Sequence, residues 1–161
     1  MKLEKAIFAC GCFWGAQYQF EHAKGVVRST VGYIGGHKEH PAYEEVKAHT
    51  TGHAEATLVE FDAEQTSFTE LCKLFFEIHD PAQTDGQGPD IGPQYRSEIF
   101  YLNDKQQEEA EAVIALLREK GYEVNTKLTP ATTFWEGEEY HQHYYDKTGG
   151  EPYCHIRVKK F

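Results

Sequence analysis

The pattern of apolar and polar residues along the chain predicts an alternation of short strands and helices. Short runs rich in β-branched and aromatic residues are typical of strands. Four segments have this character, and strands are expected at residues 5–9, 26–33, 54–61 and 95–102. A weaker pattern indicates a further strand near residues 127–134.

Three helices are expected between and after these strands, because apolar residues recur there three and four positions apart. The first helix follows Gly11 and ends at Gly25. The second begins at Ser67, which forms a capping box with Glu70. The third covers residues 104–120 and presents one apolar side.

The order of these elements predicts the fold. The first six match the split β-α-β, or ferredoxin-like, arrangement. A short helix near residues 138–146 and an extended end follow, with Lys159 and Lys160 expected in solvent. We therefore expect an α+β protein, a two-layer α/β sandwich with a ferredoxin-like core and a long C-terminal tail. Its two long loops, which end near Gly52 and Pro93, have the length of loops that usually carry function.

Composition excludes several classes of protein. The chain has 161 residues, which corresponds to one domain, and 40% of them are apolar, enough to exclude general disorder. The net charge of −10 argues against nucleic acid or an anionic membrane as the main partner. No run of about 20 apolar residues is present, and the N-terminal apolar stretch is too short for a signal peptide. A cytoplasmic location is expected.

Four cysteines, Cys10, Cys12, Cys72 and Cys154, are the first candidates for chemistry. In a cytoplasmic chain they are expected to be reduced, metal-binding or catalytic. Cys72 lies on an apolar helix face and is expected to be a buried thiol. Several of the nine histidines, with Cys10 and Cys12, suggest zinc, but no Cys-x-x-Cys spacing occurs. No metal site is expected.

Cys12 occupies the turn from the first strand into the first helix. Unpaired N–H groups and the helix dipole stabilise a thiolate at such a position, and they lower its pKa. Gly11 leaves room for a second molecule, and Phe13 and Trp14 supply an apolar wall. The residues alone leave a reactive thiol and an inert buried thiol open.

The motif Gly11-Cys12-Phe13-Trp14-Gly15 resembles the signature of the A-type peptide methionine sulfoxide reductases. Similar blocks follow in the right order over nearly the whole chain. They are Gly52-His53-Ala54-Glu55-Ala56, His79-Asp80-Pro81-Ala82-Gln83, Gln94-Tyr95-Arg96-Ser97 after Asp90, His141-Gln142, and Tyr153-Cys154. The resemblance implies a reductase of methionine S-sulfoxide, free or in proteins, acting as a single catalytic domain of residues 1–161.

The resemblance also implies roles for individual residues. Reduction by a thiol needs a nucleophile, a proton for the sulfoxide oxygen, and a fixed substrate geometry. The implied nucleophile is Cys12 and the implied proton donor is Glu55. The implied positions for hydrogen bonding and substrate binding are Tyr43, Tyr95, Asp90, Phe13 and Trp14. Without the resemblance, Glu55 would be interpreted as a solvated strand residue and Asp90 as a turn residue. The two tyrosines would be interpreted as half-buried, and Phe13 and Trp14 as core aromatics.

Recycling needs a second thiol, because the attack leaves a sulfenic acid on Cys12. The resemblance assigns this resolving role to Cys154 and implies thioredoxin as the external reductant, with no bound cofactor. Cys10 is either a second resolver or, as we expect, a buried strand thiol. His155 is expected at the surface. Nothing in the sequence demands more than a monomer.

Two other readings stay open. One is a different thiol enzyme, a peroxidase or an acyl-transferring cysteine hydrolase, the second of which needs a basic histidine beside the cysteine. The other is a redox-sensing or zinc-binding interaction module without turnover. Consumption of sulfoxide or of hydrogen peroxide, and the metal content of the purified protein, would separate them.

Overall fold

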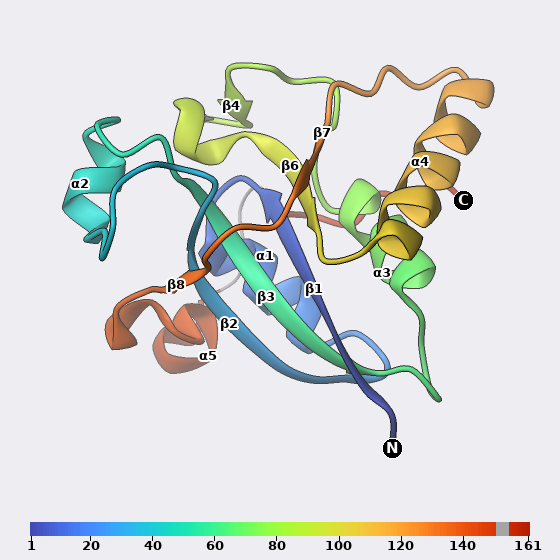
Figure 1. Ribbon diagram of the computed structural model, residues 1–161, viewed down its shortest axis with the longest axis horizontal. Coiled ribbons are helices and arrows are strands. Elements are labelled where there is room, and N and C mark those ends of the chain that lie inside the picture. Colours follow the sequence, from blue (N-terminus) through green and yellow to red (C-terminus); the bar gives the residue numbers. More distant parts are fainter. Residues whose placement is uncertain (151–154) are drawn as a thin grey trace.

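A six-stranded sheet forms the centre of the computed structural model, which describes residues 1–150 and 155–161 (Figure 1). Its core strands are β1 (Leu3–Cys10), β2 (Val26–Ile34), β3 (Ala54–Asp62) and β6 (Ser97–Tyr101). They lie in the order β6-β1-β3-β2, and each neighbouring pair is antiparallel. In chain order this is fourth, first, third, second, which confirms the ferredoxin-like core.

Two short strands extend this core at its edges. β7 (Lys127–Pro130) runs parallel to β6, and β8 (Trp135–Glu136) pairs with β2 at the opposite edge. The strand expected near 127–134 is confirmed over Lys127–Pro130 but ends there. The connecting residues cross one face of the sheet, where Ala131 and Phe134 pack against an apolar cluster of Ile7, Ala9, Ile34, Ala54, Ala56 and Phe100. Residues 131–134 are apolar because they cover this face of the sheet, and they do not continue the strand.

Three helices contribute to the apolar layer on the other face. They are α1 (Phe13–Glu21), α3 (Phe68–Glu77) and α4 (Asp104–Glu119), and they share one core cluster with β1. Phe8 of β1 lies at the centre of this cluster. Its ring stacks on Phe20 of α1 at 4.9 Å and on Phe75 of α3 at 5.3 Å between centroids. The two-layer arrangement follows from this packing.

The helix ends agree with the sequence in one case and differ in another. The side chain of Ser67 accepts a hydrogen bond from the backbone N–H of Glu70, as the capping pattern predicts. α1 ends at Glu21, earlier than expected, and Gly25 instead forms the turn into β2 with φ of +84°. A Cβ there would lie 2.7 Å from the side chain of Thr66, so this close approach also requires glycine.

The two long loops contain short elements that the sequence pattern did not indicate. The first loop holds α2 (Tyr43–Lys47). The second holds the hairpin of β4 (Gly86–Gln87) and β5 (Asp90–Ile91) and the turn η1 (Pro93–Tyr95). The helix expected near 138–146 is split into η2 (Glu139–His141) and α5 (Tyr144–Thr148), because His143 between them has a left-handed backbone with φ of 55°.

Residues 155–161 form no helix or strand and pack beside α3. The N–H of Val158 donates to the carbonyl of Glu77, and Nζ of Lys160 donates to the carbonyl of Phe76 at 2.6 Å. Lys160 is thus half-buried at the end of α3, and its expected place in solvent is wrong. Within the described residues, no helix has the length and apolar character needed to cross a membrane.

Candidate active site

Cys12 lies at the turn between the end of β1 and the start of α1, as the sequence predicts. Gly11 makes this turn with φ of +99°, and a Cβ there would lie 2.7 Å from Cβ of Gln87. Cys12 is part-buried, whereas Cys10 on β1 is only 1% exposed. The turn therefore separates a buried thiol from one that another molecule can approach.

Glu55 projects from β3, which lies between β1 and β2, and is 1% exposed. Its Oε1 accepts a 3.2 Å hydrogen bond from the backbone N–H of Phe13, the first residue of α1. Burial raises the pKa of Glu55 to about 8, against the lowering effect of this bond, and the charge of Asp90 raises it further. The carboxyl group is therefore mostly protonated at neutral pH, and the interpretation of Glu55 as a solvated strand residue is wrong.

Tyr43 and Tyr95 face the same centre from two different loops. Tyr43 is the first residue of α2 and Tyr95 the last of η1. Burial raises the pKa of both hydroxyls, to about 12 for Tyr43, and the charges of Glu55 and Cys12 add to both shifts. The carboxyl and thiol groups therefore act electrostatically on both hydroxyls.

Asp90, on β5, contributes its charge to the raised pKa values of Glu55 and Tyr95. It therefore belongs to the same group of side chains, beyond a turn role alone. The structure thus brings together Cys12, Glu55, Tyr43, Tyr95 and Asp90 from five separate segments of the chain.

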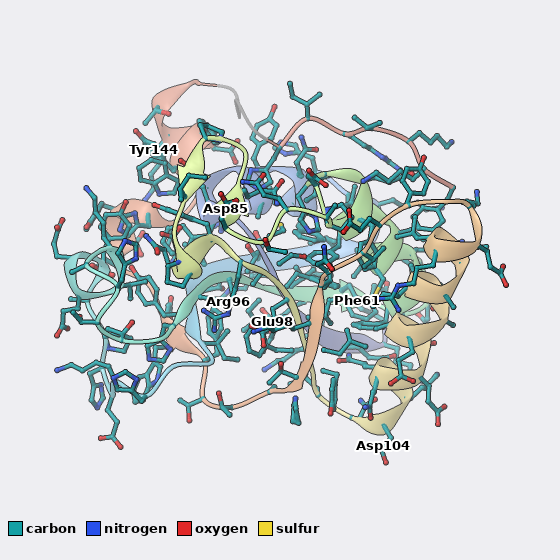
Figure 2. All side chains as sticks on the ribbon, turned by 90° about the horizontal axis from the view of Figure 1, so that it is seen from above. Phe61, Asp85, Arg96, Glu98, Asp104 and Tyr144 are labelled. Atoms are coloured by element: carbon teal, nitrogen blue, oxygen red, sulfur yellow. The ribbon has the colours of Figure 1, made fainter. Side chains whose placement is uncertain are left out.

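Phe13 and Trp14 form an aromatic wall beside Cys12. Phe13 is buried and its ring contacts Tyr43 and His141, with centroids 6.4 and 5.1 Å apart. The indole N–H of Trp14 donates a 2.9 Å hydrogen bond to Nδ1 of His141. The ring centroids of Trp14 and of Tyr144 on α5 are 3.8 Å apart, and Tyr144 is labelled in Figure 2.

His141 is a site residue to which sequence reasoning assigned no role. It is fully buried, and burial lowers its pKa below the ordinary value, so the ring is neutral. Because Nδ1 accepts the bond from Trp14, the ring proton lies on Nε2. Within the described residues, Nε2 has no hydrogen-bond partner. In the sequence, His141 was marked by the His141-Gln142 block of the resemblance and by its spacing to His143 among the histidines weighed for zinc.

Two further residues hold the loops in place. Glu138 accepts hydrogen bonds from the Tyr33 hydroxyl at 2.9 Å and from the backbone N–H of Tyr43 at 3.0 Å, which fixes the start of α2. Arg96 donates to the carbonyls of Gly52 at 3.1 Å and Pro93 at 3.0 Å, so it joins the ends of both long loops. It also pairs with Glu98 at 2.7 Å, and both are labelled in Figure 2.

The other cysteines have different surroundings. Cys10 and Cys72 are buried in the main core cluster, as expected for structural thiols, and burial raises the pKa of the Cys72 thiol well above its ordinary value. Cys154, the expected resolving residue, lies outside the described residues.

Comparison with known proteins identifies the family. The profile described as "Peptide methionine sulfoxide reductase" matches residues 4–161. The chain belongs to the peptide methionine sulfoxide reductase family. It is therefore an oxidoreductase, and its activity is the thiol-dependent reduction of methionine sulfoxide.

Relatives of this reductase agree over nearly their whole length. "Peptide methionine sulfoxide reductase MsrA" of Geobacter sulfurreducens is 48% identical over 151 residues, which cover 92% of this chain and 93% of that protein. The protein of the same name from Acinetobacter baumannii is 42% identical over 156 residues, 97% of this chain and 90% of its own. The reduced form of Mxr1 from Saccharomyces cerevisiae superposes with a TM-score of 0.91 at 32% identity, covering 99% of this chain and 93% of that one.

Among the described residues, the side chains that could together hold a metal ion lie at the far end of α1 from Cys12. Both ring nitrogens of His53 are engaged inside the first long loop, with the N–H of Gly36 and the carbonyl of Lys38. In the part of the chain that the structure describes, Glu21, His143 and Asp146 bring ligand atoms within 4.8 Å of one another, at the outer side of α1 and α5. The Cys10, Cys12 and histidine combination weighed for zinc is not assembled there.

Proposed function

We propose that this reductase acts on methionine S-sulfoxide, free or in proteins, with Cys12 as its nucleophile. The Cys12 thiolate attacks the sulfoxide sulfur, and the sulfoxide oxygen passes to the cysteine sulfur. The products are methionine and a sulfenic acid on Cys12, so the substrate is reduced by two electrons and the cysteine is oxidised by two. The preference for the S epimer is inferred from the resemblance to the A-type enzymes.

Glu55 supplies the proton that the sulfoxide oxygen needs as its bond to sulfur weakens. A carboxyl group with an ordinary pKa is ionised at pH 7 and has no proton to donate. The pKa of about 8 for buried Glu55 leaves the proton in place. The bond from the Phe13 N–H holds this carboxyl at the start of α1, one residue from Cys12. This placement of a neutral carboxyl group is the observation that carries the proposal.

The surrounding side chains hold the substrate in one geometry. Tyr43 and Tyr95 keep their protons, because their raised pKa values lie far above neutral pH, and each hydroxyl donates a hydrogen bond to the sulfoxide oxygen. Phe13 and Trp14 pack around the substrate methyl group. Asp90 completes the active site on the side of the second long loop and, through its charge, helps to keep Glu55 protonated.

Recycling uses Cys154 and thioredoxin. The Cys154 thiol condenses with the sulfenic acid on Cys12 to form a disulfide and water, and thioredoxin then reduces the disulfide through its own dithiol. The yeast protein Mxr1 has been solved in complex with Trx2, which supports a thioredoxin as the partner. No bound cofactor or metal takes part in this cycle.

The unit of function is residues 1–161, which act as a single catalytic domain and as a monomer. The family profile covers residues 4–161 as one unit, which supports a single catalytic domain. We place the cycle in the cytoplasm, where thioredoxin keeps protein thiols reduced.

The test is a single-turnover reaction of reduced enzyme with each epimer of a methionine sulfoxide peptide. About one methionine per enzyme is expected from the S epimer in the wild type, and none in Cys12→Ser, which should keep the native fold by circular dichroism. Cys72→Ser is the matched control, because it removes a buried thiol outside the site. Methionine formation by Cys12→Ser, or faster reaction of the wild type with hydrogen peroxide than with the sulfoxide, would reject the proposal.

A further inference from the structure

His155, the residue after Cys154 in the chain, is completely buried. Its ring lies on the first turns of α1, where Nε2 donates a 2.7 Å hydrogen bond to the carbonyl of Cys10. Its own carbonyl accepts a 2.5 Å bond from the side-chain amide of Gln19 on α1. The expectation of a surface histidine is therefore wrong: the ring is bonded to Cys10, and the backbone of His155 is bonded to Gln19 on α1.

Gly15 creates the space that the ring fills, and Gly11 borders this space. A Cβ on Gly15 would lie 2.3 Å from Nδ1 of His155 and 3.2 Å from its Cβ. A Cβ on Gly11 would lie 3.5 Å from Nε2. Gly15 lies inside a helix without a positive φ, where glycine is a poor helix former compared with alanine. The side chain of His155 is the reason that the structure offers for a glycine at this position. We call the space between Gly11 and Gly15 the glycine slot.

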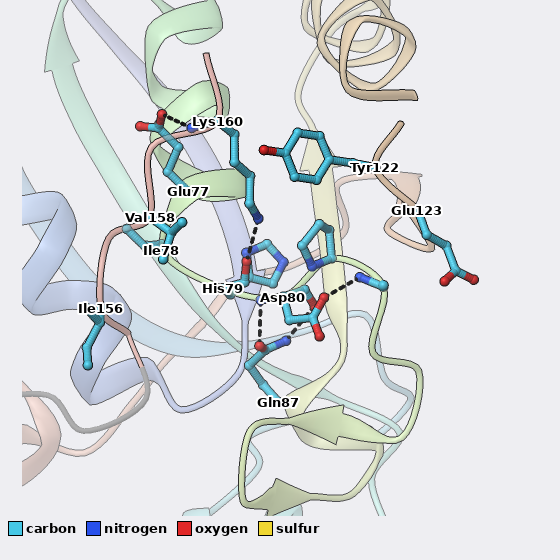
Figure 3. A pocket seen from close by; sticks show the side chains of 12 residues that line it. Glu77, Ile78, His79, Asp80, Gln87, Tyr122, Glu123, Ile156, Val158 and Lys160 are labelled. Atoms are coloured by element: carbon cyan, nitrogen blue, oxygen red, sulfur yellow. Dashed lines mark hydrogen bonds between the residues drawn. The ribbon is translucent and has the colours of Figure 1, made fainter. Parts of the chain in front are cut away.

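A second attachment holds the chain beyond His155 (Figure 3). The buried carboxylate of Glu77, at the end of α3, accepts a 2.9 Å bond from the backbone N–H of Lys160, drawn in Figure 3. It also accepts a 2.9 Å bond from Nε of Arg157. Nζ of Lys160 reaches the carbonyls of Phe76 and His79. The C-terminal segment is therefore attached at two places, at the glycine slot on α1 and at Glu77 on α3.

We propose that His155 is a positioning residue for the recycling half of the reaction: by docking in the glycine slot, it limits the positions open to its chain neighbour Cys154 when that thiol attacks Cys12. This inference rests on the proposed function, in which Cys154 resolves the sulfenic acid. His155 contacts neither the substrate nor the reacting sulfur atoms in this scheme. It acts on the rate of recycling by restricting the position of its chain neighbour, Cys154.

Chain geometry supports this role. Consecutive Cα atoms are about 3.8 Å apart, and a disulfide requires Cα atoms roughly 4.4 to 6.8 Å apart. Gly15 lies one helical turn after Cys12, so a residue fixed on Gly15 is already near the sulfenic acid. Fixing His155 limits the positions that Cys154 can occupy and so raises the effective concentration of its thiol at Cys12.

The step that His155 assists is the condensation of the two cysteines. The Cys154 sulfur attacks the sulfur of the Cys12 sulfenic acid, the new S–S bond replaces the S–O bond, and the oxygen leaves as water with the thiol proton. No further oxidant or reductant enters this step. The preceding reduction of the sulfoxide does not involve His155, so the two steps respond differently to its removal.

The decisive experiment compares wild-type protein with His155→Ala in one turnover of a methionine S-sulfoxide peptide. Methionine formation should stay within about twofold, whereas formation of the Cys12–Cys154 disulfide, followed by mass analysis of quenched samples, should slow roughly tenfold or more. Turnover driven by thioredoxin should fall with it, and turnover driven by dithiothreitol should not. His155→Gln should recover most of the rate, because its amide nitrogen can reach the Cys10 carbonyl.

Two more variants separate the glycine slot from general attachment of the segment. Gly15→Ala places a methyl group where the ring lies while favouring the helix, so it should reproduce the effect of His155→Ala. Arg157→Gln removes the side-chain bond from Arg157 to Glu77, keeps the bonds from Lys160 and leaves the glycine slot intact, so its recycling should stay within about twofold of wild type.

Several results would overturn the inference. They are an unchanged rate of disulfide formation in His155→Ala, an equal loss of methionine formation in that variant, and an equal slowing in Arg157→Gln. Failure of the proposed function looks different. In that case the wild-type protein itself forms no methionine, or forms it without a Cys12–Cys154 disulfide.

Discussion

The backbone N–H of Phe13 donates a 3.2 Å hydrogen bond to Oε1 of Glu55, which joins the first residue of α1 to the central strand β3. A helix N-terminus favours the ionised form of a carboxyl group, whereas burial favours the neutral form. Burial is the stronger effect here, since the pKa of Glu55 rises to about 8. The hydrogen bond thus places the group, and desolvation keeps its proton.

Glu55→Gln tests the proton donor. The amide keeps the shape of the carboxyl group but has no proton to give, so the reductase step should slow roughly 10²- to 10⁴-fold. In the wild type, the rate of this step should fall as pH rises through about 8, the pKa of Glu55. Rapid-quench measurement of methionine between pH 6 and 9 checks both. If Glu55→Gln slows the reductase step but its rate still falls near pH 8, the proton donor is another group, with Asp90 the next candidate.

The same substitution should change how the stability of the protein depends on pH. The pKa of Glu55 is higher in the folded state than its ordinary value of 4.5, so folding favours the protonated form. As pH rises from about 4.5 to 8, the wild type should lose about 1.4 kcal/mol of unfolding free energy per pH unit through this residue. Glu55→Gln lacks this loss. Urea unfolding at pH 5 and pH 8.5 should show the variant gaining on the wild type at the higher pH, and a constant difference would contradict the raised pKa.

His141→Phe tests the support of Trp14. The substitution removes the acceptor of the Trp14 indole N–H, so the indole should lose its fixed orientation. We expect a several-fold rise in KM for the sulfoxide and a loss of about 1 kcal/mol in unfolding free energy. His141→Asn is the matched control, because its side-chain oxygen can take the place of Nδ1. Steady-state kinetics with the same KM for His141→Phe and wild type would show that the hydrogen bond has no part in binding.

Glu77→Gln tests the attachment of the C-terminal segment. Burial raises the pKa of Glu77, but the bonds from Lys160 and Arg157 outweigh it, and the pKa lies below its ordinary value. The ionised form therefore stabilises the folded state above the ordinary pKa, and this contribution is lost as pH falls through the lowered pKa. The variant should be about 1–2 kcal/mol less stable at pH 7, and this difference should become smaller at pH 3, below the ordinary pKa of 4.5. Urea unfolding at the two pH values measures this, and an equal difference at both would exclude the ionic contribution.

Cys154→Ser separates the two candidate resolving thiols. The variant should form about one methionine per molecule and then stop with Cys12 oxidised, because thioredoxin needs a disulfide to attack. Dithiothreitol should restore turnover. Cys10→Ser should retain both steps, since the Cys10 thiol is buried on β1. A Cys10–Cys12 disulfide in the wild type, or full thioredoxin-driven turnover in Cys154→Ser, would reverse the two roles.

Sequence by itself determined the core of the fold and the place of the nucleophile. Helical and strand periods depend on which side of each segment is apolar, and this is a local property that the residues report directly. The order of six elements was enough for the β6-β1-β3-β2 core. Gly11 was enough to place Cys12 at a turn into a helix, because the turn needs a positive φ.

Tertiary structure alone decided which polar residues are buried and what they contact. Glu55 and His155 look like ordinary polar residues in the sequence, yet both are buried by segments that are distant in the chain. Residues 131–134 likewise read as a strand until the face of the sheet that they cover is known. Desolvation and hydrogen bonding arise from neighbours far apart in sequence, so the pKa of Glu55 and the docking of His155 follow from the assembled fold and not from any local pattern.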